Sequence, residues 1–180
     1  MGRRLFGNDS VNAREHRSRG HQQGCRVGRF RSDHRAQQLV SVVLMAKPPH
    51  RAVGRALRRV AYSNESYALL PDGTWNAGGC WTLAAAFKRW AGPRAELVSV
   101  ASPRNATEHV VVKVGDAYYD ADGAQTRDAL LRKMERIERV PAPNLEPFHR
   151  SRVGDIKCPR DTVTKLEHLL SKRLGKSPFK

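Results

Sequence analysis

Residues 109–123 read HVVVKVGDAYYDADG, and this is the stretch with the clearest expected structure. Two arms rich in β-branched and aromatic residues flank Gly115-Asp116, a dipeptide typical of a two-residue hairpin turn. With that turn, His109 lies opposite Asp122, and alternation puts Asp120 on the same face, diagonal to His109. A one-residue bulge would reverse which acid is nearer. Because Asp122-Gly123 also suits a turn out of the strand, we rank Asp120 ahead of Asp122 as the partner of His109.

Upstream of this hairpin, the residues Asn76-Ala77-Gly78-Gly79 lead into a predicted helix that begins at Cys80. Leu83, Phe87 and Trp90 recur at helical spacing along it, and Gly92-Pro93 predicts its end. A thiol in the first helical turn lies near unpaired N–H groups and positive potential, which favour the thiolate. The same N–H groups could bind an oxyanion that forms on an attacked carbonyl.

The remaining segments predict an α+β domain over residues 45–180. Alternation favours a strand at 95–101, Thr126 is positioned to cap a helix through about Arg139, and three prolines predict coil over 141–147. A last amphipathic, basic helix is expected from Asp161 to Gly175. We expect the helix that presents Cys80 to pack on a small antiparallel sheet of strands 95–101, 110–114 and 117–121. The predicted core is Leu83, Phe87, Trp90, Leu97, Val98, Val110, Val112, Tyr119, Leu130, Met134 and Ile137.

Charge dominates the composition of the 180 residues, whose formal net charge is +16. Residues 1–44 carry +6, with nine arginines and few apolar side chains, and are interpreted as a disordered basic arm or a translated leader that ends before Met45. No apolar run is long enough to cross a bilayer. Three widely spaced cysteines make no disulfide framework and no paired zinc motif, which favours a reducing, cytoplasmic setting with no metal and no cofactor.

A nucleophilic thiol needs a base, and the base needs a group that orients it. Cys80 as nucleophile, His109 as base and Asp120 or Asp122 as orienting acid meet that requirement in chain order. Trp81 could shield the thiol from water, and Gly79 allows a close approach before it.

The order Gly-Gly-Cys80-Trp81, then His109 on a strand, then Asp120 on the next strand, resembles the papain-like superfamily of cysteine enzymes. The resemblance covers residues 74–123 and implies a papain-like fold and an acyl-enzyme mechanism on an amide, isopeptide or ester bond. That superfamily includes thiol proteases, deubiquitinases, cell-wall amidases, transglutaminases and arylamine acyltransferases. The oxyanion glutamine of papain is absent here, with Thr74 at its offset, and Asn76 is the candidate substitute. Residues 108–123 are also similar to small uncharacterised bacterial and phage proteins.

Two other functions fit the same sequence. The net charge and the arginines of a predicted helix, Arg55, Arg58 and Arg59 among them, favour a protein that binds nucleic acid without sequence specificity. A papain-like scaffold without activity could instead serve as an interaction module. As an enzyme, the protein would act on a protein, a peptide or a small acyl substrate, and its basic surface favours an acidic one.

Overall fold

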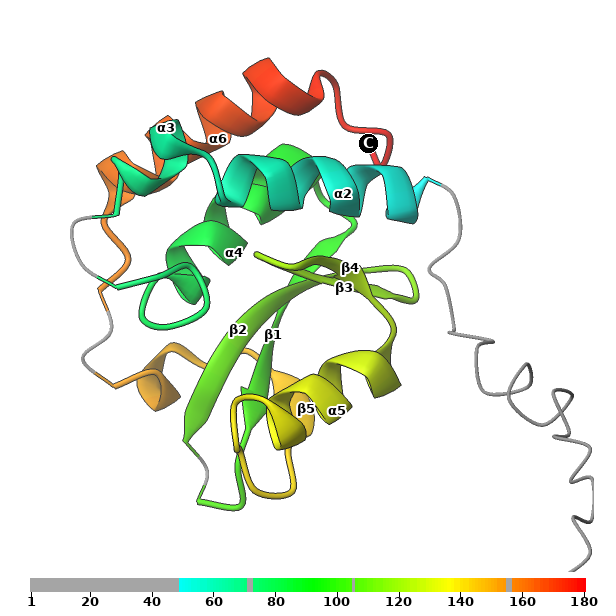
Figure 1. The fold of residues 1–180 in the computed structure, drawn as a ribbon, viewed down its shortest axis with the longest axis vertical. Helices are drawn as coiled ribbons and strands as arrows, with labels where there is room; N and C mark the ends of the chain where they lie inside the picture. The colour runs from blue at the N-terminus through cyan, green and yellow to red at the C-terminus, as the bar shows by residue number, and fades with distance from the viewer. Residues whose placement is uncertain (1–48, 71–72, 105, 155–156) are drawn as a thin grey trace, which may run out of the picture.

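The computed structural model describes residues 49–70, 73–104, 106–154 and 157–180 and combines helices with one antiparallel sheet (Figure 1). The predicted α+β class is confirmed. The five strands run in the order β4-β3-β2-β1-β5. They are β1 (Ala95–Ala101), β2 (Thr107–Val114), β3 (Ala117–Asp120), β4 (Gly123–Gln125) and β5 (Asn144–Pro147). The arm predicted at residues 1–44 lies outside the described residues.

The helices lie on both faces of this sheet. Helices α2, α4 and α6 pack together over one face, and α5 covers the other (Figure 1). The helical elements are α2 (His50–Ala61), α3 (Asn64–Tyr67), α4 (Cys80–Ala91), α5 (Arg127–Arg136), the short 3-10 turn η2 (Arg150–Arg152) and α6 (Arg160–Leu174). Among the described residues, none of these helices combines the length and the apolar character required to span a bilayer.

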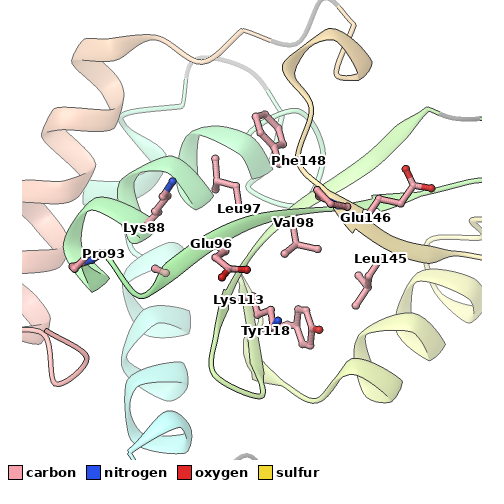
Figure 2. Close-up of a pocket in the computed structure, with 12 residues that line it drawn as sticks. Lys88, Pro93, Glu96, Leu97, Val98, Lys113, Tyr118, Leu145, Glu146 and Phe148 are labelled. Atoms are coloured by element: carbon pink, nitrogen blue, oxygen red, sulfur yellow. The ribbon is translucent and has the colours of Figure 1, made fainter.

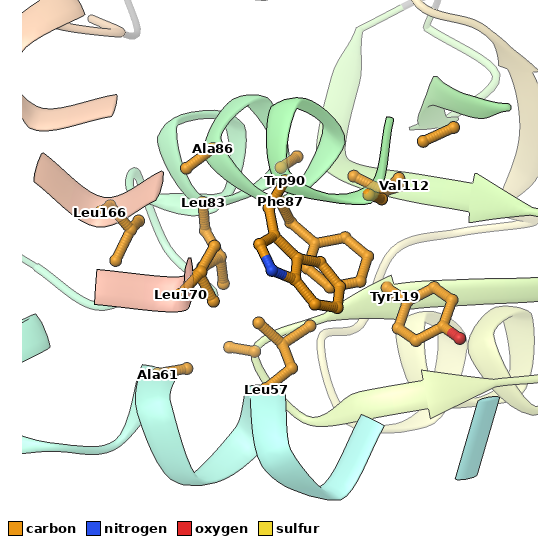
Figure 3. Close-up of a cluster of buried hydrophobic side chains, with 14 of the residues drawn as sticks. Leu57, Ala61, Leu83, Ala86, Phe87, Trp90, Val112, Tyr119, Leu166 and Leu170 are labelled. Carbon is orange, nitrogen blue, oxygen red and sulfur yellow. The ribbon is translucent and has the colours of Figure 1, made fainter. Parts of the chain in front are cut away.

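Helix α4 lies at the centre of the main hydrophobic core. Figure 3 shows Phe87 and Trp90 of α4 between Leu57 of α2 and Tyr119 of β3, with α6 on the other side. The Phe87 and Tyr119 ring centroids are 4.8 Å apart. A smaller core lies between the sheet and α5 and is made of Val98, Val100, Val111, Leu130, Met134 and Val140. The sheet is therefore covered on both faces, and its strands lie between two hydrophobic layers.

The predicted hairpin register is confirmed. Val114 pairs with Ala117 across Gly115-Asp116, and Val112 pairs with Tyr119. Gly115 has φ +58°, a conformation that glycine adopts at little cost. Thr126 caps α5 as expected, because its hydroxyl accepts a hydrogen bond from the backbone N–H of Ala129.

Three expectations about this part of the chain are wrong. Helix α5 ends at Arg136 rather than near Arg139, so Ile137 becomes its C-cap and is 70% exposed instead of buried. The strand that carries His109 begins at Thr107 rather than at residue 110. The segment predicted as coil contains β5, because an edge strand tolerates Pro147, which cannot donate a backbone hydrogen bond.

Candidate active site

Cys80 is the first residue of α4 and is 4% exposed. The chain reaches it through two glycines that serve different purposes. Gly78 has φ +85°, a left-handed conformation. Gly79 has ordinary angles, but a Cβ there would lie 2.9 Å from the Thr74 carbonyl oxygen and 3.0 Å from the Trp75 ring. The Gly-Gly pair therefore allows a tight turn and then a close approach of the turn to the start of the helix.

The Cys80 thiol lies against the His109 ring at the start of β2. Burial raises the pKa of the thiol, but the contact with His109 and the backbone N–H groups of Val110 and Trp81 outweigh burial. The net result is a pKa below the ordinary value of a cysteine. The helix N-terminus contributes in the same direction, because its positive potential stabilises a thiolate.

His109 is also next to Asp120, the last residue of β3. The distance from His109 Nε2 to Asp120 Oδ2 is 3.5 Å, and both side chains are 2% exposed. Burial opposes the charged form of His109, but Asp120 and Cys80 outweigh burial and raise its pKa to about 9. Burial likewise opposes the ionised form of Asp120, but His109 and Lys133 lower its pKa to about 2. The three groups therefore favour a thiolate, an imidazolium and a carboxylate in contact.

Asp120 is held by three further donors. Gln125 Nε2 lies 2.8 Å and the backbone N–H of Asp122 lies 2.9 Å from its Oδ1. Lys133 Nζ of α5 lies 2.8 Å from Oδ2. Neither Gln125 nor Lys133 was predicted from the sequence. The only signal for Lys133 was its position three residues after the buried Leu130, on the inner side of the predicted helix.

Asp122 does not reach His109, contrary to the strict pairing expected from the hairpin. Residues 121 and 122 form the turn that leads from β3 into β4, where Asp120 pairs with Gly123. The Asp122 carboxylate instead accepts a hydrogen bond of 2.8 Å from the Tyr62 hydroxyl and forms an ion pair of 2.5 Å with Lys133. The structure thus brings Asp120, not Asp122, to the imidazole.

Asn76 and Trp81 lie in positions that differ from their expected roles. Asn76 Nδ2 lies 3.3 Å from both Tyr62 Oη and Asp122 Oδ2, so its donor group is engaged there rather than at the thiol. The Trp81 ring packs against Phe148, with the guanidinium of Arg150 4.3 Å above it. Trp75 was missed by the sequence analysis and lines the space beside Cys80 and His109, with its indole Nε1 buried and unpaired.

The space around the thiol is closed in this structure. It is enclosed by apolar side chains together with His109 and Asp120, and it is too narrow for a water molecule. Trp75 is 1% exposed, although Gly73, Thr74, Ala77 and Gly78 in the same loop are at the surface. Residues 73–79 therefore form a surface loop with one side chain, that of Trp75, buried beside the thiol.

A larger groove, of about 780 Å³, lies elsewhere on the described surface. Figure 2 shows it alongside β1, with Lys88 of α4 on one side and Lys113, Tyr118 and Leu145 on the other. It contains no thiol and no imidazole. Its Phe148 contacts Trp81, the neighbour of Cys80 in α4.

No protein-family model, no curated protein and no solved structure matches this chain. Within the described ranges, no group of three or more His, Cys, Asp or Glu side chains is arranged to hold a metal ion. Cys80 and Cys158 are both free thiols.

Proposed function

We propose that this protein is a cysteine-dependent hydrolase or acyltransferase of the papain-like type, acting on an amide, isopeptide or ester bond. One observation carries the proposal: the His109 ring lies between the Cys80 thiol at a helix N-terminus and the Asp120 carboxylate. Burial alone raises the pKa of a cysteine because it disfavours the thiolate, as it does for the partly buried Cys158. The opposite shift at Cys80 is the arrangement that a nucleophile needs.

In the proposed reaction, the Cys80 thiolate attacks the carbonyl carbon and forms a carbon–sulfur bond. Backbone N–H groups at the start of α4 stabilise the charge that develops on the carbonyl oxygen. The His109 imidazolium then gives its proton to the leaving amine or alcohol, and the acyl-enzyme remains. His109 next takes a proton from water or from an acceptor amine, which attacks the thioester and releases the acyl product. Asp120 keeps the ring oriented and stabilises its cation during both steps.

Substrate entry requires the closed site to open, and residues 73–79 are the segment that we propose moves. Gly73 and Gly78, which have positive φ angles, flank the loop. Its contact with the rest of the molecule through Asn76 consists of two long hydrogen bonds, to Tyr62 and Asp122. Movement of the loop would withdraw Trp75 from the space beside the thiol.

The proposed setting is the cytoplasm, where free Cys80 and Cys158 would stay reduced. Within the superfamily, we favour a peptide, isopeptide or small acyl substrate with an acidic group. The support for an acidic substrate is the guanidinium of Arg150, which lies over Trp81, the residue that follows Cys80.

Reaction with iodoacetamide at neutral pH tests the proposal directly. We expect Cys80, once the loop of residues 73–79 opens, to be alkylated faster than Cys158, because the pKa of Cys80 is lowered whereas partial burial raises the pKa of Cys158. Peptide mapping after short exposures measures the two rates in the same molecule. Equal rates at all cysteines would count against the enzyme. The cluster would then be a structural one, as in an inactive interaction module.

A second candidate function rests on the outer side of α2. Four arginines recur there at positions 51, 55, 58 and 59, all of them exposed, and the helix contains no acid. In the described part of the chain, none of the four forms a salt bridge. The apolar side of α2 is buried in the core, so the helix cannot insert into a membrane while the domain is folded. We propose that this arginine stripe binds the phosphate backbone of a nucleic acid.

Replacing the four arginines of the stripe with glutamine should weaken binding to duplex DNA and lower its salt dependence. Each lost phosphate contact reduces the slope of log affinity against log salt by about 0.9, so we expect a fall of about 3–4. Fluorescence anisotropy over a salt series measures it. A matched control removes the same charge elsewhere with Arg94, Arg104, Arg132 and Arg136 replaced by glutamine. Equal slopes for the two variants would show that the stripe is not the binding surface.

A further inference from the structure

The position of Lys133 is not explained by the Cys80, His109 and Asp120 arrangement alone. It projects from α5, on the sheet face opposite α4, and its side chain is only 12% exposed. Its Nζ lies 2.8 Å from Asp120 Oδ2 and 2.5 Å from Asp122 Oδ2. One ammonium group therefore bridges two carboxylates, and one of them is the acid beside His109.

The bridged oxygen of Asp120 is also the one that faces the imidazole. His109 Nε2 lies 3.5 Å from Asp120 Oδ2, while Lys133 lies closer to that same atom. Nε2 makes no hydrogen bond in the described structure, so its contact with Asp120 is electrostatic. Lys133 and the imidazolium thus compete for one carboxylate oxygen.

The charges around this oxygen come from several elements. Cys80 is on α4, His109 on β2, Asp120 on β3, Asp122 in the following turn and Lys133 on α5. Tyr62, at the end of α2, is neutral here, because burial and the contact with Asp122 raise its pKa to about 12. Without a cation, the carboxylates of Asp120 and Asp122 would repel each other, and only the imidazolium of His109 would remain to balance Asp120.

We propose that Lys133 is a positioning residue of the active site, which offsets the repulsion between Asp120 and Asp122 and limits how strongly Asp120 holds the imidazolium. Through Asp122, the same ammonium group is connected to Asn76 in the loop over the thiol. Lys133 therefore links the orienting acid to the turn that precedes the nucleophile. This inference rests on the proposed function, since it concerns the same thiol and imidazole.

The test compares Lys133→Met with the wild-type protein. Loss of one positive charge raises the pKa of an acid or a cation nearby, so the apparent pKa values of both Cys80 and His109 should rise, each by about one unit. Ultraviolet absorbance of the thiolate and NMR titration of the imidazole measure these values. Lys133→Arg, which keeps the charge and can contact both carboxylates, should restore the wild-type profile. Arg132→Met, on the exposed side of α5, is the matched control and should change neither pKa.

If Lys133→Met does not fold because buried Asp120 has lost its cation, Lys133→Gln replaces it in the test. Glutamine still donates hydrogen bonds to the carboxylates but carries no charge. A purely structural lysine would lower the melting temperature of these variants and leave both titrations unchanged, which would overturn the inference. An unreactive Cys80 in the wild-type protein would instead overturn the proposed function. The two failures are therefore distinguishable.

Discussion

Replacing His109 with alanine should slow the alkylation of Cys80 at neutral pH by between about tenfold and a thousandfold. A charged partner within contact distance shifts a pKa by about 1–3 units, and each unit changes the thiolate fraction tenfold. His109 is the main group that offsets the burial of Cys80. Without it, burial dominates, and the thiol pKa should rise above its ordinary value. The rate of alkylation by iodoacetamide, followed by mass spectrometry, measures the change.

The pH dependence of the same variant separates this cause from misfolding. The wild-type thiolate is present above the lowered pKa of Cys80, so its alkylation should already be fast at neutral pH. In His109→Ala, the rate should keep rising into the alkaline range and approach the wild-type rate once the thiol ionises by itself. Cys158 provides an internal control, because its pKa is raised by burial and it does not depend on His109. Equal rates for Cys80 in both proteins at neutral pH would refute its activation by His109.

The local features of this site could be predicted from the sequence. A glycine pair before Cys80 and a periodic apolar pattern after it indicate a helix that begins at the thiol. A Gly-Asp pair between two β-rich arms sets the hairpin register and brings residues near 109 and 120 together. Both predictions involve contacts within one element or between neighbours in the chain, where spacing alone determines which residues meet.

The choice between Asp120 and Asp122 could not be made from spacing, because it depends on where the ladder ends. Pairing of β2 with β3 ends at Val112 and Tyr119, and Asp120 is then held by the backbone of Asp122 and by Gln125 of β4. The contact of Lys133 with both acids depends on how α5 packs against the sheet. No local pattern reports such a long-range contact, and the same is true of the Trp75 side chain that lines the space beside Cys80.

Gly54 connects the packing of α2 to this site through a close contact with β4. A Cβ added to Gly54 would lie 2.4 Å from the backbone nitrogen and 2.6 Å from the Cβ of Ala124. On the other side of the contact, Gly123 has φ +105°, and its own added Cβ would lie 2.7 Å from the Gly54 carbonyl oxygen. The helix and the strand therefore approach each other at a distance that two glycines make possible. Next to Ala124 is Gln125, which donates to Asp120.

Replacing Gly54 with alanine should lower the free energy of unfolding, although alanine is the better helix former. The gain in helix propensity is about 1 kcal/mol, whereas overpacking against a backbone costs about 1–3 kcal/mol or more. Since the contact is with main-chain atoms, no rotamer change relieves it, and we expect a net loss of about 2 kcal/mol in urea unfolding. Ala52→Gly, at an exposed position of the same helix, is the matched control and should cost about 1 kcal/mol through propensity alone. If Gly54→Ala stabilised the protein instead, α2 would not be packed on β4 this closely.

The same substitution should also slow the alkylation of Cys80. The added methyl group pushes β4 away from α2, and this displacement moves Gln125 away from Asp120.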